Sequence, residues 1–332
     1  MSQTTQVHDV SGYLNKSAMV RMAEYFDDLA TGRTQVPRQP VQTRIRDSIS
    51  DRNVLAYHDL MISNAGPLFS HFLASVPCIL EEMSRVGVAL TRLSQKRANN
   101  GRLFSFYEID GFDGSNGRTL AKHSDGLIRT LTSSPNKANE IHFNRFADHS
   151  TSKFHAESFL CVNRYVLDER ADLHEFRHGF DYLYETAAFQ FYGQDRENQI
   201  GHVASLLKDD GLAFFLEKLN HADPTEYNRR EQVKDNLHKS HYFTPEEIEW
   251  KRQQMLSQMH NGQVSFDELI KAIHRHFQHV YLIWNSTNFY EFVASNNEEN
   301  LETFVGTLGK PYLAEEFRFE NPFLRKVTGH PL

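Results

Sequence analysis

From Arg102 onward, short β-rich runs alternate with segments of helical pattern, which leaves few architectures open to this chain. Strands that alternate with helices are typical of parallel βαβ units and therefore of an α/β sheet. Two later runs, separated by a turn at 286–288, predict a β-hairpin instead of a further crossover. The runs are Leu103–Ile109, Glu140–Phe146, Ser158–Val162, Phe180–Tyr184 and Leu212–Leu219, then His279–Asn285 and Tyr290–Ser295 for the hairpin.

The first hundred residues have helical patterns and no comparable β-rich run. We expect helices over Val20–Leu29 and Val41–Ile62, and another that begins at Pro67, bends or restarts at Pro77 and reaches about Arg97. Asn99 to Gly101 should end the last of them. The predicted organisation is a helical N-terminal extension or lid at 1–100, followed by an α/β domain at 101–332.

A glycine-rich turn follows the first predicted strand, in the segment Tyr107–Gly117. Its glycines, Gly111, Gly114 and Gly117, let backbone approach a ligand closely, and the helix that follows offers free N–H groups. A turn of this kind is also an ordinary structural requirement after a strand. The GxxGxxG spacing differs from the GxGxxG of dinucleotide-binding sheets.

A second segment is the stronger evidence for the fold and the cofactor. Phe180–Ala188 and Gln199–Glu217 give a strand, a loop, an amphipathic helix over Glu197–Lys208, a tight Asp-Gly turn and a second strand. With its LLKDDG sequence at 206–211, this segment resembles class I S-adenosylmethionine-dependent methyltransferases, which have LLKPGG there. The resemblance covers roughly 103–300. It implies a Rossmann-like, mainly parallel seven-stranded sheet with a terminal hairpin, and S-adenosyl-L-methionine as cofactor.

The resemblance also implies a cofactor site. It assigns Glu108, Asp110, Gly111, Gly114, Gly117 and Thr186 to the cofactor, with Glu108 bracing the turn. The family's E/D-x-G-x-G-x-G becomes EIDGFDGSNG in this chain, so the path of the loop is expected to differ around Phe112 and Asp113. The acidic residue that closes the second strand and holds the ribose is not obvious. Asp148 is our choice, and an ordinary loop carboxylate is the alternative.

Methyl transfer from a sulfonium is an in-line displacement that depends mainly on positioning, and only some acceptors need a base. Glu185, just after the fourth strand, is the first candidate for a catalytic residue, and His155 is the second. The alternative for Glu185 is that it accepts backbone hydrogen bonds and caps the loop.

A charged, helical insertion at about 222–262 is expected to cover the acceptor together with the N-terminal extension. Aromatic residues that could wall an apolar acceptor pocket are Tyr192, Trp284 and Tyr290, although core packing is the commoner role of such residues. Thr244 to Glu247 has the pattern of a helix start.

Composition limits the partners. The formal charge is −7, which disfavours wrapping of nucleic acid. The two cysteines have no CxxC spacing, and no run approaches a membrane span, so we expect a cytoplasmic protein. The 18 histidines include clusters at 238–241 and 274–279 without further convergent ligands, so no metal is predicted. A homodimer is left open.

These observations favour methyl transfer from S-adenosylmethionine to a small organic molecule, such as a specialised metabolite. Two alternatives remain. One is an NAD-binding oxidoreductase, disfavoured by the glycine spacing and the terminal hairpin. The other is a degenerate methyltransferase fold that acts as a scaffold, for which the irregular glycine turn is the best support.

Overall fold

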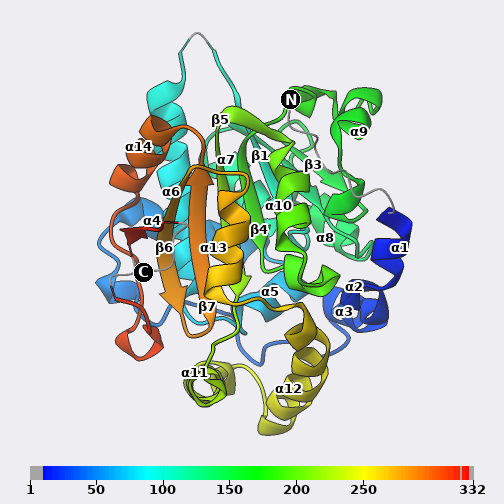
Figure 1. The fold of residues 1–332 in the computed structure, drawn as a ribbon, viewed down its shortest axis with the longest axis vertical. Helices are drawn as coiled ribbons and strands as arrows, with labels where there is room; N and C mark the ends of the chain where they lie inside the picture. Colours follow the sequence, from blue (N-terminus) through cyan, green and yellow to red (C-terminus); the bar gives the residue numbers. More distant parts are fainter. Residues whose placement is uncertain (1–9, 100, 322–323, 329–332) are drawn as a thin grey trace.

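A computed structural model describes residues 10–99, 101–321 and 324–328. In this part of the chain, eight strands form one sheet in the order β3-β2-β1-β4-β5-β7-β6-β8, shown in Figure 1. The strands are β1 (Phe104–Ile109), β2 (Ile128–Ser133), β3 (Ser152–His155), β4 (Phe180–Thr186), β5 (Leu207–Lys218), β6 (His279–Ser286), β7 (Phe289–Ser295) and β8 (Arg325–Lys326).

Strands β1 to β5 are parallel, and β7 runs antiparallel to β5 and to β6. The β6–β7 hairpin turns at Thr287 and Asn288, and Thr287 has the left-handed φ of +55° that such a tight turn requires. A β3-β2-β1-β4-β5-β7-β6 sheet with an antiparallel β7 is the class I methyltransferase arrangement. The predicted fold is therefore confirmed. It differs from the wholly parallel 3-2-1-4-5-6 order of NAD-binding sheets.

Helices cover both faces of the sheet because successive strand side chains point to opposite faces. Phe106 belongs to a cluster shared with α4, α6, α7 and α14, whereas the adjacent Tyr107 belongs to a cluster shared with α9, α10 and α13. Figure 1 shows these as layers around the central sheet. The bounds are α7 (Ser115–His123), α8 (Asn139–Phe146), α9 (Arg164–Glu169), α10 (Arg196–Ala204), α13 (Phe266–His274) and α14 (Glu298–Leu308).

The N-terminal helices serve two purposes. Helix α6 packs on the sheet, where Ser94 hydrogen-bonds Tyr182 of β4, and nearly every side chain of α6 from Ile79 to Ser94 is buried. Helix α4 packs against α6 and α7. Helix α3 instead forms a small cluster with Leu68 of α5, whereas Phe69 and Leu73 of α5 belong to the large sheet cluster. The helices are α1 (Val10–Asn15), α2 (Ala18–Arg21), α3 (Ala23–Ala30), α4 (Arg52–Asn64), α5 (Pro67–Leu73) and α6 (Ile79–Arg97). Residues 1–9 and Asn100 of the predicted extension lie outside the described residues.

Several predicted elements were wrong. The run at 140–146 is helix α8, and the run at 158–162 contains a 3-10 turn, whereas the third strand lies between them at β3. The predicted helix over 41–62 begins only at α4. Helix α10 ends at Ala204 and Lys208 already lies in β5, so the expected Asp-Gly turn is part of a strand. At 140–146 the apolar spacing was compatible with both periods, and tertiary packing decided between them.

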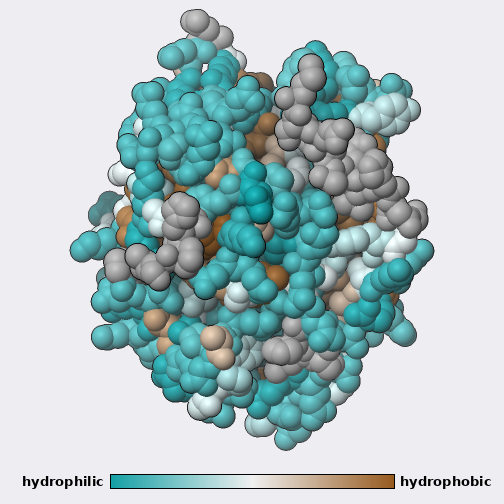
Figure 2. Space-filling model, in the orientation of Figure 1, coloured by the Kyte–Doolittle hydropathy of each residue, from teal (hydrophilic) through white to brown (hydrophobic). Residues whose placement is uncertain are grey.

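Two helices between β5 and α13 stand beyond one end of the sheet in Figure 1, α11 (Pro224–Leu237) and α12 (Pro245–Met259). Trp250 of α12 packs on Tyr25 of α3, and Lys251 of α12 contacts His71 of α5. Thr244 and Glu247 form the expected start of α12, because each side chain accepts a hydrogen bond from the other's backbone N–H. The face in Figure 2 is mostly hydrophilic, with apolar residues in small areas. Within the described residues, no helix is long and apolar enough to cross a membrane.

Candidate functional site

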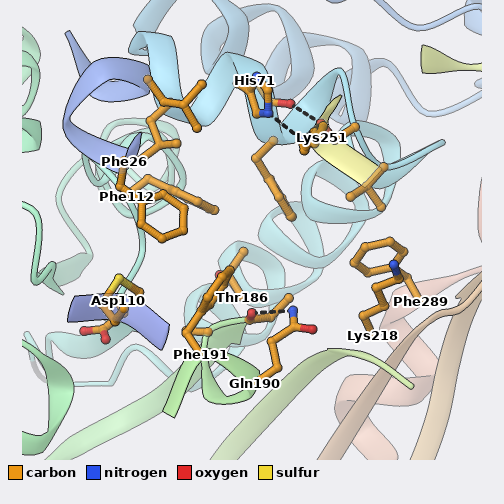
Figure 3. Close-up of a pocket in the computed structure, with 18 of the residues that line it drawn as sticks. Phe26, His71, Asp110, Phe112, Thr186, Gln190, Phe191, Lys218, Lys251 and Phe289 are labelled. Carbon is orange, nitrogen blue, oxygen red and sulfur yellow. Dashed lines mark hydrogen bonds between the residues drawn. The ribbon is translucent and has the colours of Figure 1, made fainter. Parts of the chain in front are cut away.

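The cavity at the ligand-binding edge of the sheet, here called the main cavity, lies where β1, β2, β4 and β5 end and is covered by the N-terminal helices and by α11 and α12. Its volume is about 1080 Å³, including its open mouth. Parallel sheets bind ligands at this edge, beside the point where strand order reverses between β1 and β4. Figure 3 shows Asp110 on one side of the cavity, Lys218 and Lys251 on the other, and aromatic side chains including Phe26 and Phe112 around it.

The turn after β1 follows an unusual path. Asp110 and Phe112 have φ angles of +47° and +58°, which side chains other than glycine rarely adopt, and Gly114 has +73°. When Glu108 is aligned with the first residue of E/D-x-G-x-G-x-G, two of the three glycine positions are Asp110 and Phe112. The ring of Phe112 reaches the cavity and packs on Phe72, with centroids 5.0 Å apart. This path agrees with the expected departure at Phe112.

The glycines of the turn are required by the protein's own packing. A Cβ at Gly111 would lie 2.1 Å from Cγ of Glu108, and one at Gly114 would lie 2.8 Å from Oγ1 of Thr132. Glu108 lies beneath the turn, where its Oε2 accepts hydrogen bonds from the Gly117 N–H and the Thr132 hydroxyl at 3.1 Å. A larger side chain at Gly114 would therefore disturb folding as well as any ligand.

Asp110 is nearly fully hydrogen-bonded within the protein. Oδ1 accepts from the Phe159 N–H at 2.7 Å and the Ser133 hydroxyl at 2.9 Å, while Oδ2 accepts from the Tyr192 hydroxyl at 2.5 Å. Burial raises the pKa of Asp110 to about 6, although these hydrogen bonds act in the opposite direction. Tyr192 therefore holds Asp110 and does not line the main cavity, contrary to its predicted role as a substrate residue.

The structure contradicts the choice of Asp148. Strand β2 ends at Ser133, whereas Asp148 lies fifteen residues later, between α8 and β3, where it is exposed and accepts hydrogen bonds from Ser150. The residues that follow β2 into the cavity are uncharged. Ser134 and Asn136 line it, together with Asn139, whose side-chain amide donates to the Ser134 hydroxyl at 3.0 Å. The error followed from placing the second strand at 140–146.

The end of β4 contributes Thr186 to the cavity. Its hydroxyl is buried and has no hydrogen-bond partner among the described residues, so it is available to a ligand. Glu185 does not line the cavity. Its Oε1 accepts hydrogen bonds from the backbone N–H groups of Ala188 and Phe189, which is the loop-capping alternative. Burial, together with the nearby Glu217, raises the pKa of Glu185 well above its ordinary value.

His155, the second predicted catalytic residue, also lies away from the cavity. It ends β3 and is 4% exposed, and its Nδ1 contacts a guanidinium nitrogen of Arg170 at 2.7 Å. Desolvation and Arg170 lower its pKa. His155 therefore belongs to an edge cluster of the sheet and not to the site.

The two remaining aromatic predictions are also wrong in position. Trp284 is fully buried in the sheet cluster that includes α6, and Tyr290 packs on the opposite face beside Phe292. Neither lines the cavity, so core packing, the alternative given above, is what the structure shows. Phe289, next to Tyr290, does reach the cavity.

A set of basic residues that no sequence pattern indicated lies at the far end of the cavity. Four lysines line it, each less than a tenth exposed, and only two nearby lining residues, Glu231 and Asp235, are acidic. The lysines are Lys218, Lys234, Lys239 and Lys251. Three of them lie within the insertion, but helical charge patterns are usually solvated faces, so no signal in the sequence marked these lysines as buried.

No cluster of three or more histidine, cysteine or acidic side chains suitable for a metal ion occurs among the residues that the structure describes. His238 and His274 instead approach backbone carbonyl oxygens, of Leu73 and Val327.

No protein-family description matches this chain, and no curated protein matches its sequence. Among solved structures, the plantazolicin methyltransferase BpumL with S-adenosylhomocysteine and a substrate analogue is 10% identical over 86% of this chain and all of its own, with a TM-score of 0.44. An O-methyltransferase family protein from Burkholderia thailandensis is 11% identical over 88% of this chain and 73% of its own, with a TM-score of 0.40. The cyclopropane synthase MmaA2 from Mycobacterium tuberculosis is 12% identical over 81% and 84%, with a TM-score of 0.39. The order and direction of the strands assign the fold.

Proposed function

We propose that this protein transfers a methyl group from S-adenosylmethionine to a small organic molecule. The observation that carries the proposal is the position of the cavity, at the carboxyl ends of the strands beside the β1–β4 switch point of a β3-β2-β1-β4-β5-β7-β6 sheet. The cavity is mostly apolar with a few polar groups, as in small-molecule sites generally.

The residues present fit such a cofactor. The unpartnered Thr186 hydroxyl, with Ser134 and Asn136 at the end of β2, provides hydrogen-bonding groups on the side of the cavity where the glycine turn lies. We assign these residues to the cofactor, with Glu108 fixing the turn from below. When bound, the cofactor would supply a methyl group already activated by its sulfonium.

The chain's contribution to transfer is then orientation and exclusion of water. Phe26, Phe72 and Phe191 wall the part of the cavity next to Thr186, and Phe26 packs edge-on against Phe191 with centroids 5.2 Å apart. Holding an acceptor in line with the methyl group supplies much of the barrier reduction. Since Glu185 and His155 do not reach the cavity, we assign the rate to positioning and not to proton removal by either of them.

Titration calorimetry with S-adenosylmethionine, S-adenosylhomocysteine and NAD tests the proposal. We expect both sulfur compounds to bind and NAD not to bind. Thr186→Val should weaken binding by about three- to tenfold, the value of one hydrogen bond, with unchanged unfolding behaviour. Thr91→Val is the control, since Thr91 is a buried threonine of α6 outside the cavity. Absence of binding to the parent protein would overturn the proposal.

One observation favours a second candidate, a methyltransferase fold that acts as a scaffold without cofactor. Asp110 and Phe112 place side chains where the family pattern has glycine, and the Asp110 carboxylate is already satisfied by the protein. The same calorimetry separates the candidates, because a scaffold would bind neither S-adenosylmethionine nor S-adenosylhomocysteine.

A further inference from the structure

The cavity has two chemically different ends. Near the glycine turn, Asp110 is the one acidic lining residue among those described, and the wall combines aromatic and aliphatic side chains with uncharged polar ones such as Ser134 and Thr186. Beyond Phe289, the lining becomes basic, with four lysines, His71 and the partly exposed Arg252. Figure 3 shows Lys218 and Lys251 on the side of the cavity opposite Asp110.

The two carboxylates of the basic end are each already held between cations. Glu231 lies between Lys218, at 2.9 Å, and Lys234. Asp235 lies between Lys239, at 2.8 Å, and Arg252, at 2.6 Å. Arg252 also pairs with Glu249 at 3.3 Å, so the surplus lies with the four buried lysines, which face two carboxylates. Buried charge without a counter-charge is unfavourable, so a surplus of this kind indicates a missing anion.

Lys251 is the lysine of this group without a carboxylate partner among the described residues. Its ammonium donates to Nε2 of His71 and to Oγ of Ser75, the latter at 2.6 Å. Both acceptors are themselves oriented by α5 and its surroundings. Nδ1 of His71 donates to the Gln35 carbonyl at 3.1 Å, and the Ser75 hydroxyl donates to the His71 carbonyl at 2.6 Å.

This arrangement holds the lysine in one position without supplying a negative charge to pair with it. Two acceptors use two of the three ammonium N–H groups, and the side chain projects into the cavity. Burial and the neighbouring Lys239 and Lys234 lower the pKa of Lys251 well below its ordinary value, and burial lowers that of Lys239 to about 8. An anion among these lysines would favour their charged forms.

We propose that the lysine end of the cavity, formed by Lys218, Lys239 and Lys251, binds the phosphate or diphosphate group of an organic phosphate ester whose apolar body lies against Phe72, Phe191 and Phe289. A multiply charged oxyanion fits this surplus of cations better than a single carboxylate would. The anion site itself does not depend on the proposed function. Only the further step, that this ester is the methyl acceptor, rests on it.

Thermal unfolding and calorimetry with pyrophosphate, inorganic phosphate and acetate, at equal ionic strength and without S-adenosylmethionine, test the anion site separately from the cofactor. A ligand that binds only the folded state raises the melting temperature. We expect the largest rise with pyrophosphate, a smaller rise with phosphate and none with acetate. An equal rise with all three, or none with any, would overturn the assignment.

Lys251→Met is the test variant. Methionine is close to lysine in size and removes a buried amine that has no carboxylate partner, so the variant should fold as well as the parent or better. Its affinity for pyrophosphate should fall at least about tenfold. Lys271→Met, at an exposed lysine of α13, is the matched control and should bind as the parent does. A Lys251→Met protein with undiminished pyrophosphate affinity would contradict the proposal.

If pyrophosphate binds and S-adenosylmethionine does not, the anion site stands and the proposed transferase function fails. If S-adenosylmethionine binds and pyrophosphate does not, the proposed transferase function stands and the anion site fails. Calorimetric titration of each compound into the same parent protein therefore separates the two proposals.

Discussion

Glu185 shows how a single carboxyl group can look catalytic in the sequence and lie outside the site. It follows a strand at the ligand-binding edge, yet its oxygen accepts the N–H groups of Ala188 and Phe189 beneath the loop. Burial and the nearby Glu217 raise the pKa of Glu185 well above its ordinary value, which favours the neutral carboxyl group. A glutamine, neutral and able to accept the same two bonds, should replace it closely.

We therefore expect Glu185→Gln to retain transfer within a few-fold of the parent. Glu185→Ala leaves two buried N–H groups unpaired and should lower the free energy of unfolding by about 1–3 kcal/mol. Urea unfolding and initial rates at saturating S-adenosylmethionine measure both effects. A Glu185→Gln variant with normal cofactor affinity and about a hundredfold slower transfer would restore Glu185 as the base.

Glu108 predicts a pH dependence. Burial raises its pKa to about 8, with Asp113 acting in the same direction and Arg118 against it. Between the unfolded value near 4.5 and about 8, the folded state binds the extra proton, so this group's contribution to stability is present at low pH and is lost as pH rises. Glu108→Gln can still accept the Gly117 N–H and stays neutral throughout.

Relative to the parent, Glu108→Gln should gain stability from pH 5 to pH 8, by roughly 1 kcal/mol per pH unit. Urea unfolding of both proteins at pH 5, 6, 7 and 8 measures the difference. Two stability curves that stay parallel over this range would show that Glu108 does not titrate there, and Asp148→Asn, at an exposed carboxylate, supplies the baseline.

Helix α3 is the element whose removal should separate binding from transfer. Phe26 and Leu29 line the cavity, and the larger sheet cluster begins only at Val41. Among the described residues of this region, only partly buried ones of α1 and α2 contact the second sheet cluster. Deleting residues 1–40 should therefore leave the sheet folded and should open the acceptor end of the cavity to water. We expect transfer to fall more than affinity for S-adenosylhomocysteine.

Phe26→Ala in the full chain tests the same point if the truncated protein is insoluble. It should raise KM for the acceptor or lower kcat while cofactor affinity stays within about twofold. Phe146→Ala, on the partly exposed end of α8, is the control. Full turnover by the truncated protein would make α3 a packing element and not a cover of the acceptor.

At the scale of the molecule, β1, β4, β5 and the terminal hairpin could be predicted because each shows its own local pattern, whereas β2 and β3 were not predicted. Tyr107 to Gly117 and Tyr290 to Ser295 are examples, with strand and turn residues in direct succession. Asp148 failed because a helix and a strand share the apolar spacing of 140–146. The cavity's basic end could not be predicted, since His71, Lys218 and Lys251 meet only through tertiary packing.

The two outer strands of the sheet determine how copies of this protein can meet. At one margin β3 is four residues long and carries Lys153, and at the other β8 places Arg325 and Lys326 beside β6. Short edge strands that carry cationic side chains are poor templates for backbone pairing between the sheets of two molecules. Any self-association would therefore use helical surfaces, and partly unfolded chains would find little at these margins to seed strand-by-strand aggregation.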